Sequence, residues 1–436
     1  MEKYRTHIII LILNALFCIG VLNLPFKAKL YGDNTFHNEA KIASSILKGK
    51  SSPNNLMITW APGPVLFYAI PYTFVASDTD HAYWIAGTIW NMLFLSIASW
   101  YLLASVILLT NNRGKTLFLA LLLIIPLQLY YGFSIIAETM AFCGCCLFLF
   151  GITNFIKGKY GKHPSITFIA GLLMMVLSRP NTILVFGFIP LILAWLYFRK
   201  DMQYRILVKK LIFPFFITCA LFIATIFIVK RLPTNQNKTN QENLFLLVNH
   251  IGRFQFRTEL TDWRFWDSDC RADSKDYIDF VKSVIELDEK IVNEKKTYNE
   301  VYEDWLIHDI ISHPSGFAIQ TFVRVIYGNY LQINSVSYNK LAIGPISGKT
   351  TSFLIHLVLN LINLGIIIMA VFGFKNLYAF NKATILLILP YVALLLFHSL
   401  IYMEQRYLYP ARPIILLLAT NGILNLLKHK FQQVKQ

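Results

Sequence analysis

The sequence has little charge. Only 15% of its 436 residues are Asp, Glu, Lys or Arg, whereas soluble domains carry about 25%. Hydrophobic residues make up 56% of the chain and come in long runs. Such runs are expected to form membrane-spanning helices, because a segment in lipid has to satisfy its own backbone hydrogen bonds. The composition excludes an ordinary soluble protein and predicts an all-α polytopic membrane protein.

About ten of these runs approach the ~20 residues needed to cross the hydrocarbon core. We predict spans near 7–25, 84–109, 116–133, 139–156, 165–178, 181–198, 211–229, 352–373, 383–402 and 411–427. The first could be mistaken for a signal peptide. It is longer than the usual hydrophobic part of one and lacks a clear cleavage site, so we interpret it as a retained anchor.

Cysteine is scarce and does not form a disulfide framework. Five of the six cysteines lie in predicted spans, and Cys270 stands alone in a polar segment. The cluster CGCC at 143–146 has no nearby His or second Cys pair, which favours small-residue helix packing over a metal site. A true phosphate-binding loop is also missing, since GPISGKT at 344–350 has three residues between its glycines and that motif needs four.

Acidic residues are almost missing from one side of the membrane. If the N-terminus is cytosolic and the spans alternate, all but two of the 24 Asp and Glu residues fall on the extracytoplasmic side or at its boundary. The cytosolic loops are rich in Lys and Arg, the usual signal of orientation. The net charge of +16 therefore indicates topology and not nucleic-acid binding, and carboxylate chemistry is expected outside.

Two extracytoplasmic segments are long, and they divide the chain. Residues 1–229 form an N-terminal transmembrane module with a first outer loop at 26–83, residues 230–351 an extracytoplasmic helical segment, and residues 352–436 the C-terminal transmembrane helices. In the first loop we expect a helix ended by Gly49, and a Pro-interrupted helix that lies at or dips into the outer surface. Further helices are expected at 276–294, 298–314 and 316–331, the last of them at the membrane surface.

Three extracytoplasmic carboxylates are candidates for chemistry. Asp33 follows the first span, and a low-dielectric boundary raises the basicity of a carboxylate, which suits a general base. Glu39 lies six residues further on, too far to share a helical face with Asp33, and both can equally be solvated loop residues. Glu138 opens the fourth span, either as a second catalytic or metal-binding acid or as an acid favoured by the helix N-terminus.

Other polar residues on this side have ordinary explanations. Asp78, Asp80 and His81 precede the second span, and we favour capping for them, because an acid there satisfies free backbone N–H groups. The cations Arg179, Arg406, Arg412, Lys27 and Lys29 either reach toward lipid headgroups or bind a phosphate.

Several motifs follow one another in a recognisable order through nearly the whole chain. An acid follows the first helix, an outer helix starts with Pro-Gly, an acid opens the fourth span, Arg-Pro follows the fifth, and Arg-Tyr precedes the last. The stretches are GDNTFHNEAKIASSILKGK, APGPVLFYAIPY, IIAETMAF, GLLMMVLSRPNTILV and EQRYLYPARPIILLLA. Together they resemble the GT-C superfamily of integral-membrane glycosyltransferases, in the branch with the dolichyl-phosphate-mannose protein mannosyltransferases and the lipid A aminoarabinose transferases.

The resemblance implies a mechanism. A sugar on a polyprenyl phosphate is presented at the outer membrane face, an acid in the first outer loop acts as general base on an acceptor hydroxyl, and the sugar transfers with inversion. Asp33 matches that acid. The family often has Asp-Glu where this chain has Asp33-Asn34, which keeps Glu39 as a rival base, and Glu138 matches the second acidic position. Metal dependence differs among branches, so a divalent metal stays an open alternative, although no compelling ligand set is present.

The leaving lipid phosphate is an anion and needs cations nearby. Arg406 matches the Arg of the Arg-Tyr motif, and Arg179, Lys27 and Lys29 are further candidates on that side. His37 and Tyr407 are the expected substrate contacts.

The leading hypothesis is a polyprenyl-phosphate-sugar-dependent glycosyltransferase of a bacterial inner membrane that modifies an envelope glycan, lipid or protein. The alternatives are an envelope polysaccharide polymerase of the O-antigen type and a lipid-linked sugar transporter. A transporter should carry charges deep in its spans, whereas the interiors of the predicted spans are nearly free of charge.

Overall fold

The computed structural model describes residues 2–23, 34–52, 56, 61–77, 79–110, 114, 117–119, 121, 137–199, 201–230, 285–287, 289–312, 314–329, 348–400 and 405–433. All regular elements in these ranges are helices. Several predicted features lie outside them, wholly or for the most part: Asp33, Asp78, Lys27, Lys29, Cys270, the span at 116–133 and the helix at 276–294.

The chain forms two compact units. One comprises Met1–Thr234, Tyr330–Leu394 and Gln405–Gln436, and the other Asn235–Asn329 and Leu395–Glu404. The second unit contains α13 (Tyr298–Ser312) and α14 (Pro314–Asn329), and α16 (Ile385–Leu400) runs from the first unit into the second. The first unit contains α1 (Glu2–Asn23), α2 (Asn34–Leu47), α3 (Pro62–Tyr72), α4 (Asp80–Thr110), α7 (Ala137–Ile156), α8 (Lys162–Ser178), α9 (Ile183–Phe198), α10 (Met202–Lys230), α15 (Gly348–Phe380) and α17 (Arg412–Gln433), with the 3-10 helices η3 (Pro180–Thr182), η6 (Lys382–Thr384) and η7 (Gln405–Ala411).

The described helices confirm an all-α membrane protein. Six segments are long and apolar enough to cross a membrane, whereas α8 and α9 are apolar but only 17 and 16 residues long. The total of ten spans is not confirmed and stays a prediction. The six segments are Asp80–Thr110, Ala137–Ile156, Met202–Ile228, Leu357–Phe380, Lys382–Leu400 and Leu408–Lys428.

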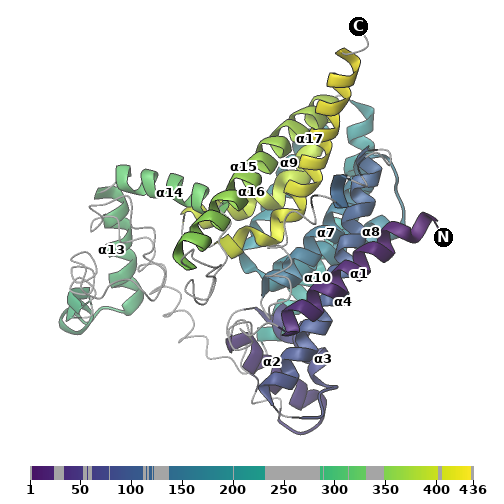
Figure 1. Cartoon of the computed structure of the whole chain (residues 1–436). Coiled ribbons are helices and arrows are strands. Elements are labelled where there is room, and N and C mark those ends of the chain that lie inside the picture. The colour runs from purple at the N-terminus through teal and green to yellow at the C-terminus, as the bar shows by residue number, and fades with distance from the viewer. Residues whose placement is uncertain are drawn as a thin grey trace. The chain divides into compact units, whose positions relative to one another are not determined.

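Helix α7 lies at the centre of the first unit. In the most apolar 18-residue stretch of α7, 83% of the residues are buried, against 22% in the corresponding stretch of α10. Helix α7 packs on both α4 and α8 (Figure 1). The close approach to α8 depends on glycine, because a Cβ on Gly144 would come within 2.7 Å of the carbonyl oxygen of Gly171. The cysteines on either side of Gly144 are buried free thiols. This confirms that the CGCC stretch serves helix packing.

A second glycine contact joins α15 to α17. A Cβ on Gly373 would collide with the backbone oxygen of Leu418, and a Cβ on Gly422 with that of Met369. Backbone atoms cannot turn aside as a side chain can, so the two helices keep this separation only while both residues lack a side chain.

Alanine at Gly373 is therefore expected to destabilise the protein by about 1–3 kcal/mol, the usual cost of overpacking. The matched control is Gly365→Ala on the same helix, since a Cβ there meets nothing within 4 Å. Ala is the better helix former by about 1 kcal/mol, so this control should be neutral or mildly stabilising. Thermal unfolding of the two purified variants in detergent measures the difference, and equal midpoints would contradict the glycine contact.

The two short helices expected in the first outer loop are present. α2 ends just before Gly49, whose φ of +70° is the left-handed conformation of a helix stop. α3 starts at Pro62 and packs on α4, α7 and α8. Its first turn lies directly against the end of α8. A Cβ on Gly63 would come within 2.7 Å of the carbonyl oxygen of Leu177. An apolar cluster joins α2, α3 and the start of α7 through Ala43, Leu56, Ala61, Val65, Ala69 and Ala137.

Candidate functional site

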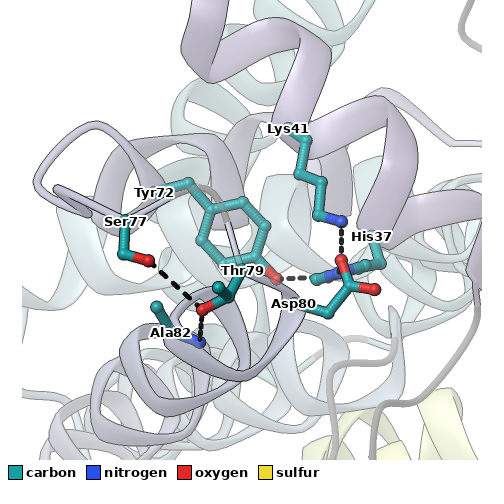
Figure 2. A network of polar contacts seen from close by, with 7 residues as sticks. All are labelled: His37, Lys41, Tyr72, Ser77, Thr79, Asp80 and Ala82. Atoms are coloured by element: carbon teal, nitrogen blue, oxygen red, sulfur yellow. Dashed lines mark hydrogen bonds and ion pairs between the residues drawn. The ribbon is translucent and has the colours of Figure 1, made fainter.

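Four side chains from the first outer loop meet where α2, α3 and α4 come together, and we name them the His37 cluster: His37, Lys41, Tyr72 and Asp80. His37 and Lys41 lie one turn apart on α2 and both face Asp80, the first residue of α4 (Figure 2). The His37 Nδ1 atom is 2.9 Å from the Tyr72 hydroxyl, and its Nε2 atom is 3.6 Å from Asp80 Oδ1. The Lys41 ammonium forms an ion pair with the same carboxylate oxygen.

Burial sets the protonation of the His37 cluster. The His37 ring is 4% exposed, and this burial lowers its pKa; the charge of Lys41 lowers it further, while Asp80 opposes both. Burial also raises the pKa of the Tyr72 hydroxyl, which therefore keeps its proton. The arrangement suits a neutral imidazole that accepts a hydrogen bond from Tyr72 at Nδ1 and turns its Nε2–H toward Asp80. The cluster thus holds α2 to the end of α3 and the start of α4.

This burial predicts a pH dependence of stability. Above the ordinary His pKa of 6.5, His37 is neutral both folded and unfolded. As the pH falls below that value the unfolded chain takes up the proton first, so the free energy of unfolding decreases until the lowered folded pKa is passed. His37→Gln should remove this part of the loss. Thermal unfolding measured from about pH 8 to about pH 5 checks it.

The control for this experiment is His81→Gln, because the His81 ring is exposed and its aromatic neighbour is Trp84, with ring centroids 5.6 Å apart. This variant should keep the acid sensitivity of the wild type. An acid sensitivity that is unchanged in His37→Gln would show that the loss arises elsewhere.

The start of α4 is capped by a threonine. The Thr79 hydroxyl accepts a hydrogen bond from the Ala82 N–H at 3.3 Å, as Figure 2 shows. The prediction that Asp80 caps this helix is therefore wrong. Its carboxylate has a stronger partner in the ammonium of Lys41, while Asp78 lies outside the described residues.

Two residues that were predicted for separate roles form an ion pair. Glu138, the second residue of α7, is 1% exposed and accepts a hydrogen bond from Arg179, which directly follows α8. The buried acid is thereby balanced by a guanidinium from the neighbouring helix. The first turn of α3 covers this end of α7 and α8, through the contacts that Ala61 and Gly63 make there.

The 3-10 helix η7 brings a further predicted element to this end of α7. It carries Arg406 and Tyr407, whose backbone is described although their side chains are not. In the same helix the Tyr409 ring stacks on Phe142, one turn after Glu138, with ring centroids 4.8 Å apart and an angle of 16° between the planes. The 3-10 helix that carries the Arg-Tyr motif therefore packs on the half of α7 that contains Glu138.

Two more of the charged candidates are buried within the protein. Arg412, at the start of α17, is 3% exposed and donates a hydrogen bond to Asn363 of α15 at 2.9 Å. This contact ties two helices together and turns the side chain away from lipid. The Glu39 side chain on α2 is buried as well, at 6% exposure, so the solvated-loop interpretation of this residue is wrong.

Sequence reasoning missed the partners of His37. The spacing of His37 and Lys41 was a usable signal, since residues four apart share a helical face. Nothing in the sequence pointed to Tyr72, which lies 35 residues away from His37. Its hydroxyl comes close to His37 only because α3 packs on α2. Its neighbour Tyr68 is also fully buried and donates a hydrogen bond to Asn91 of α4 at 3.0 Å.

Within the described ranges no group of three or more His, Cys, Asp or Glu side chains is arranged to hold a metal ion.

Comparison with known proteins identifies no family for this chain. No protein-family model, no curated protein and no solved structure matches the sequence or the fold.

Proposed function

We propose that the protein is a glycosyltransferase of a bacterial cell membrane. It transfers a sugar from a polyprenyl phosphate to a hydroxyl of an envelope glycan, lipid or protein, with inversion, at the extracytoplasmic face. The observation that carries this proposal is the position of the Glu138–Arg179 ion pair and of the buried Arg412 in the first unit. Glu138 is the second residue of α7, Arg179 directly follows α8 and Arg412 is the first residue of α17, so each lies at a helix end.

Charge at helix ends favours an interfacial reaction over a translocation path. A transporter for a charged, sugar-bearing lipid needs polar groups at the depth of the bilayer centre. A polyprenyl phosphate is too apolar to leave the bilayer, so an enzyme has to meet its sugar at the membrane boundary. The buried ends of α7 and α8, covered by α3 from the first outer loop, are suited to that depth.

The chemistry requires one base and several cations. Asp33 in the first outer loop, or its rival Glu39, removes the proton of the acceptor hydroxyl as the oxygen attacks the anomeric carbon. The bond from that carbon to the phosphate oxygen breaks, and the lipid phosphate leaves with the electron pair. Arg406, Lys27 and Lys29 stabilise its charge. Arg179 contributes less freely, because it also balances Glu138.

The decisive experiment offers donors to the purified protein in lipid nanodiscs. A panel of polyprenyl monophosphate sugars is compared with oligosaccharides linked to polyprenyl diphosphate, and the released lipid phosphate is measured. We expect turnover of one monophosphate donor and a product whose anomeric configuration is opposite to that of the donor. Turnover of diphosphate-linked repeats alone would support the polymerase, and movement of intact donor across the bilayer would support a transporter.

A further inference from the structure

Helix α14 in the second unit has an unusual distribution of polarity. Past its first turn, the exposed residues among those whose side chains are described are Ala318, Ile319, Phe322 and Ile326. Ile319, Phe322 and Ile326 are spaced by three and four residues and so lie on one face of the helix, with Ala318 at its edge. Ile319, Phe322 and Ile326 are 45%, 65% and 50% exposed. Past the first turn, the described side chains of this exposed face are all apolar.

The charged residue of α14 is on the opposite face. Arg324 is 6% exposed, and the turn of an α-helix places it about 180° from the middle of the apolar face. A helix in water has the reverse arrangement, with its charges exposed and its apolar side chains covered. We therefore expect Ile319, Phe322 and Ile326 to face an apolar environment.

Arg324 also joins α14 to the end of α16. Its guanidinium donates hydrogen bonds to the carbonyl oxygens of Ser399, at 3.4 Å, and Leu400, at 3.2 Å. These are the last two residues of α16, which ends a segment long and apolar enough to span the membrane. The last carbonyls of a helix have no partner within it and form the negative end of its dipole, so a buried cation is well placed there.

We propose that α14 lies in the plane of the membrane surface, with Ile319, Phe322 and Ile326 inserted among the lipid chains where α16 ends. Helix α14 has 16 residues and an internal arginine, so it is too short and too polar to span the membrane. A helix in the interface buries its apolar face about 5–10 Å deep. Arg324 holds the helix there, because it needs the terminal carbonyls of α16 at that level. The inference needs only that α16 crosses the membrane, whichever reaction the protein catalyses.

Photo-crosslinking in nanodiscs identifies what covers this face. The photoreactive residue p-benzoyl-phenylalanine replaces Phe322. It is also placed at two reference positions, one at a time. Phe216, 62% exposed on the span α10, is the lipid-facing reference. Glu294, which forms an ion pair with Lys296 and whose side chain is 44% exposed, is the water-facing reference. Mass spectrometry of the labelled peptides separates phospholipid adducts from crosslinks to protein.

We expect position 322 to give phospholipid adducts at a yield close to that of position 216 and several-fold above that of position 294. A covalent dimer band would show that a second copy covers the face. Crosslinks within the chain would show that another segment covers it, and a yield equal to that of position 294 would show that it faces water. Each of these three results overturns the proposal. Because Phe322 is exposed, the replacement is not expected to disturb the fold.

Discussion

Asp33→Asn is expected to slow sugar transfer by about 100- to 10,000-fold, the usual contribution of a general base. The amide has nearly the shape of the carboxylate but cannot accept the proton of the acceptor hydroxyl. The loss should appear in kcat/KM together with loss of the acidic limb of its pH profile, since that limb reports the ionisation of the base in the free enzyme. Initial rates with the active donor across a range of pH values test both effects.

The control for Asp33 is the rival carboxylate Glu39. If Asp33 is the base, Glu39→Gln should keep the shape of the pH profile, with a rate change that follows its effect on the packing of this buried side chain in α2. If Glu39→Gln abolishes the acidic limb and Asp33→Asn does not, the assignments are exchanged. Retention of full activity by both single variants and by the double variant would refute a carboxylate base in this loop.

Arg179→Gln is expected to destabilise the protein by about 3–5 kcal/mol, the usual cost of breaking a buried ion pair on one side. The substitution leaves the carboxylate of Glu138, with a side chain 2% exposed, without its guanidinium partner. Glu138→Gln should cost less, because the Arg179 side chain is 20% exposed and can turn toward water. Thermal unfolding in detergent ranks the two variants.

The double variant Glu138→Gln/Arg179→Gln isolates the pair. Two neutral amides carry no unbalanced charge, so the double variant should recover much of the stability that Arg179→Gln loses, and the double-mutant cycle should show a coupling above 0.5 kcal/mol, the lower bound for residues in contact. Additive losses would mean that Glu138 and Arg179 act independently.

The local elements of the first outer loop were predictable because their causes are local. Gly49 ends α2 through its own backbone conformation, and Pro62 starts α3 at a position where its missing N–H costs nothing. The cap of α4 was misjudged for a reason that is not local. Asp80 and Thr79 are both suitable caps by type. In the folded protein the Asp80 carboxylate pairs with Lys41 of α2, and the Thr79 hydroxyl caps the helix.

In the candidate site, individual residues could be predicted from the sequence, but their partners could not. Glu138 and Arg179 were singled out by residue type and by their place in the order of the spans, since charge in so apolar a chain is costly unless it has a use, and His37 was named as a substrate contact in the same outer loop. Their partners could not be named. Glu138 and Arg179 are 41 residues apart, and His37 and Tyr72 are 35 apart.

The sequence by itself determined that the chain is a helical membrane protein, because a backbone in lipid has to close its hydrogen bonds within each segment, and twenty neighbouring residues are enough to require that. It also determined where glycine and proline end or begin a helix. Only the tertiary structure decided which charges neutralise each other, that Asp80 binds Lys41, and that α14 buries its arginine and exposes its apolar face. These outcomes depend on contacts between segments far apart in the chain, where several partners of the same type compete and packing geometry selects one.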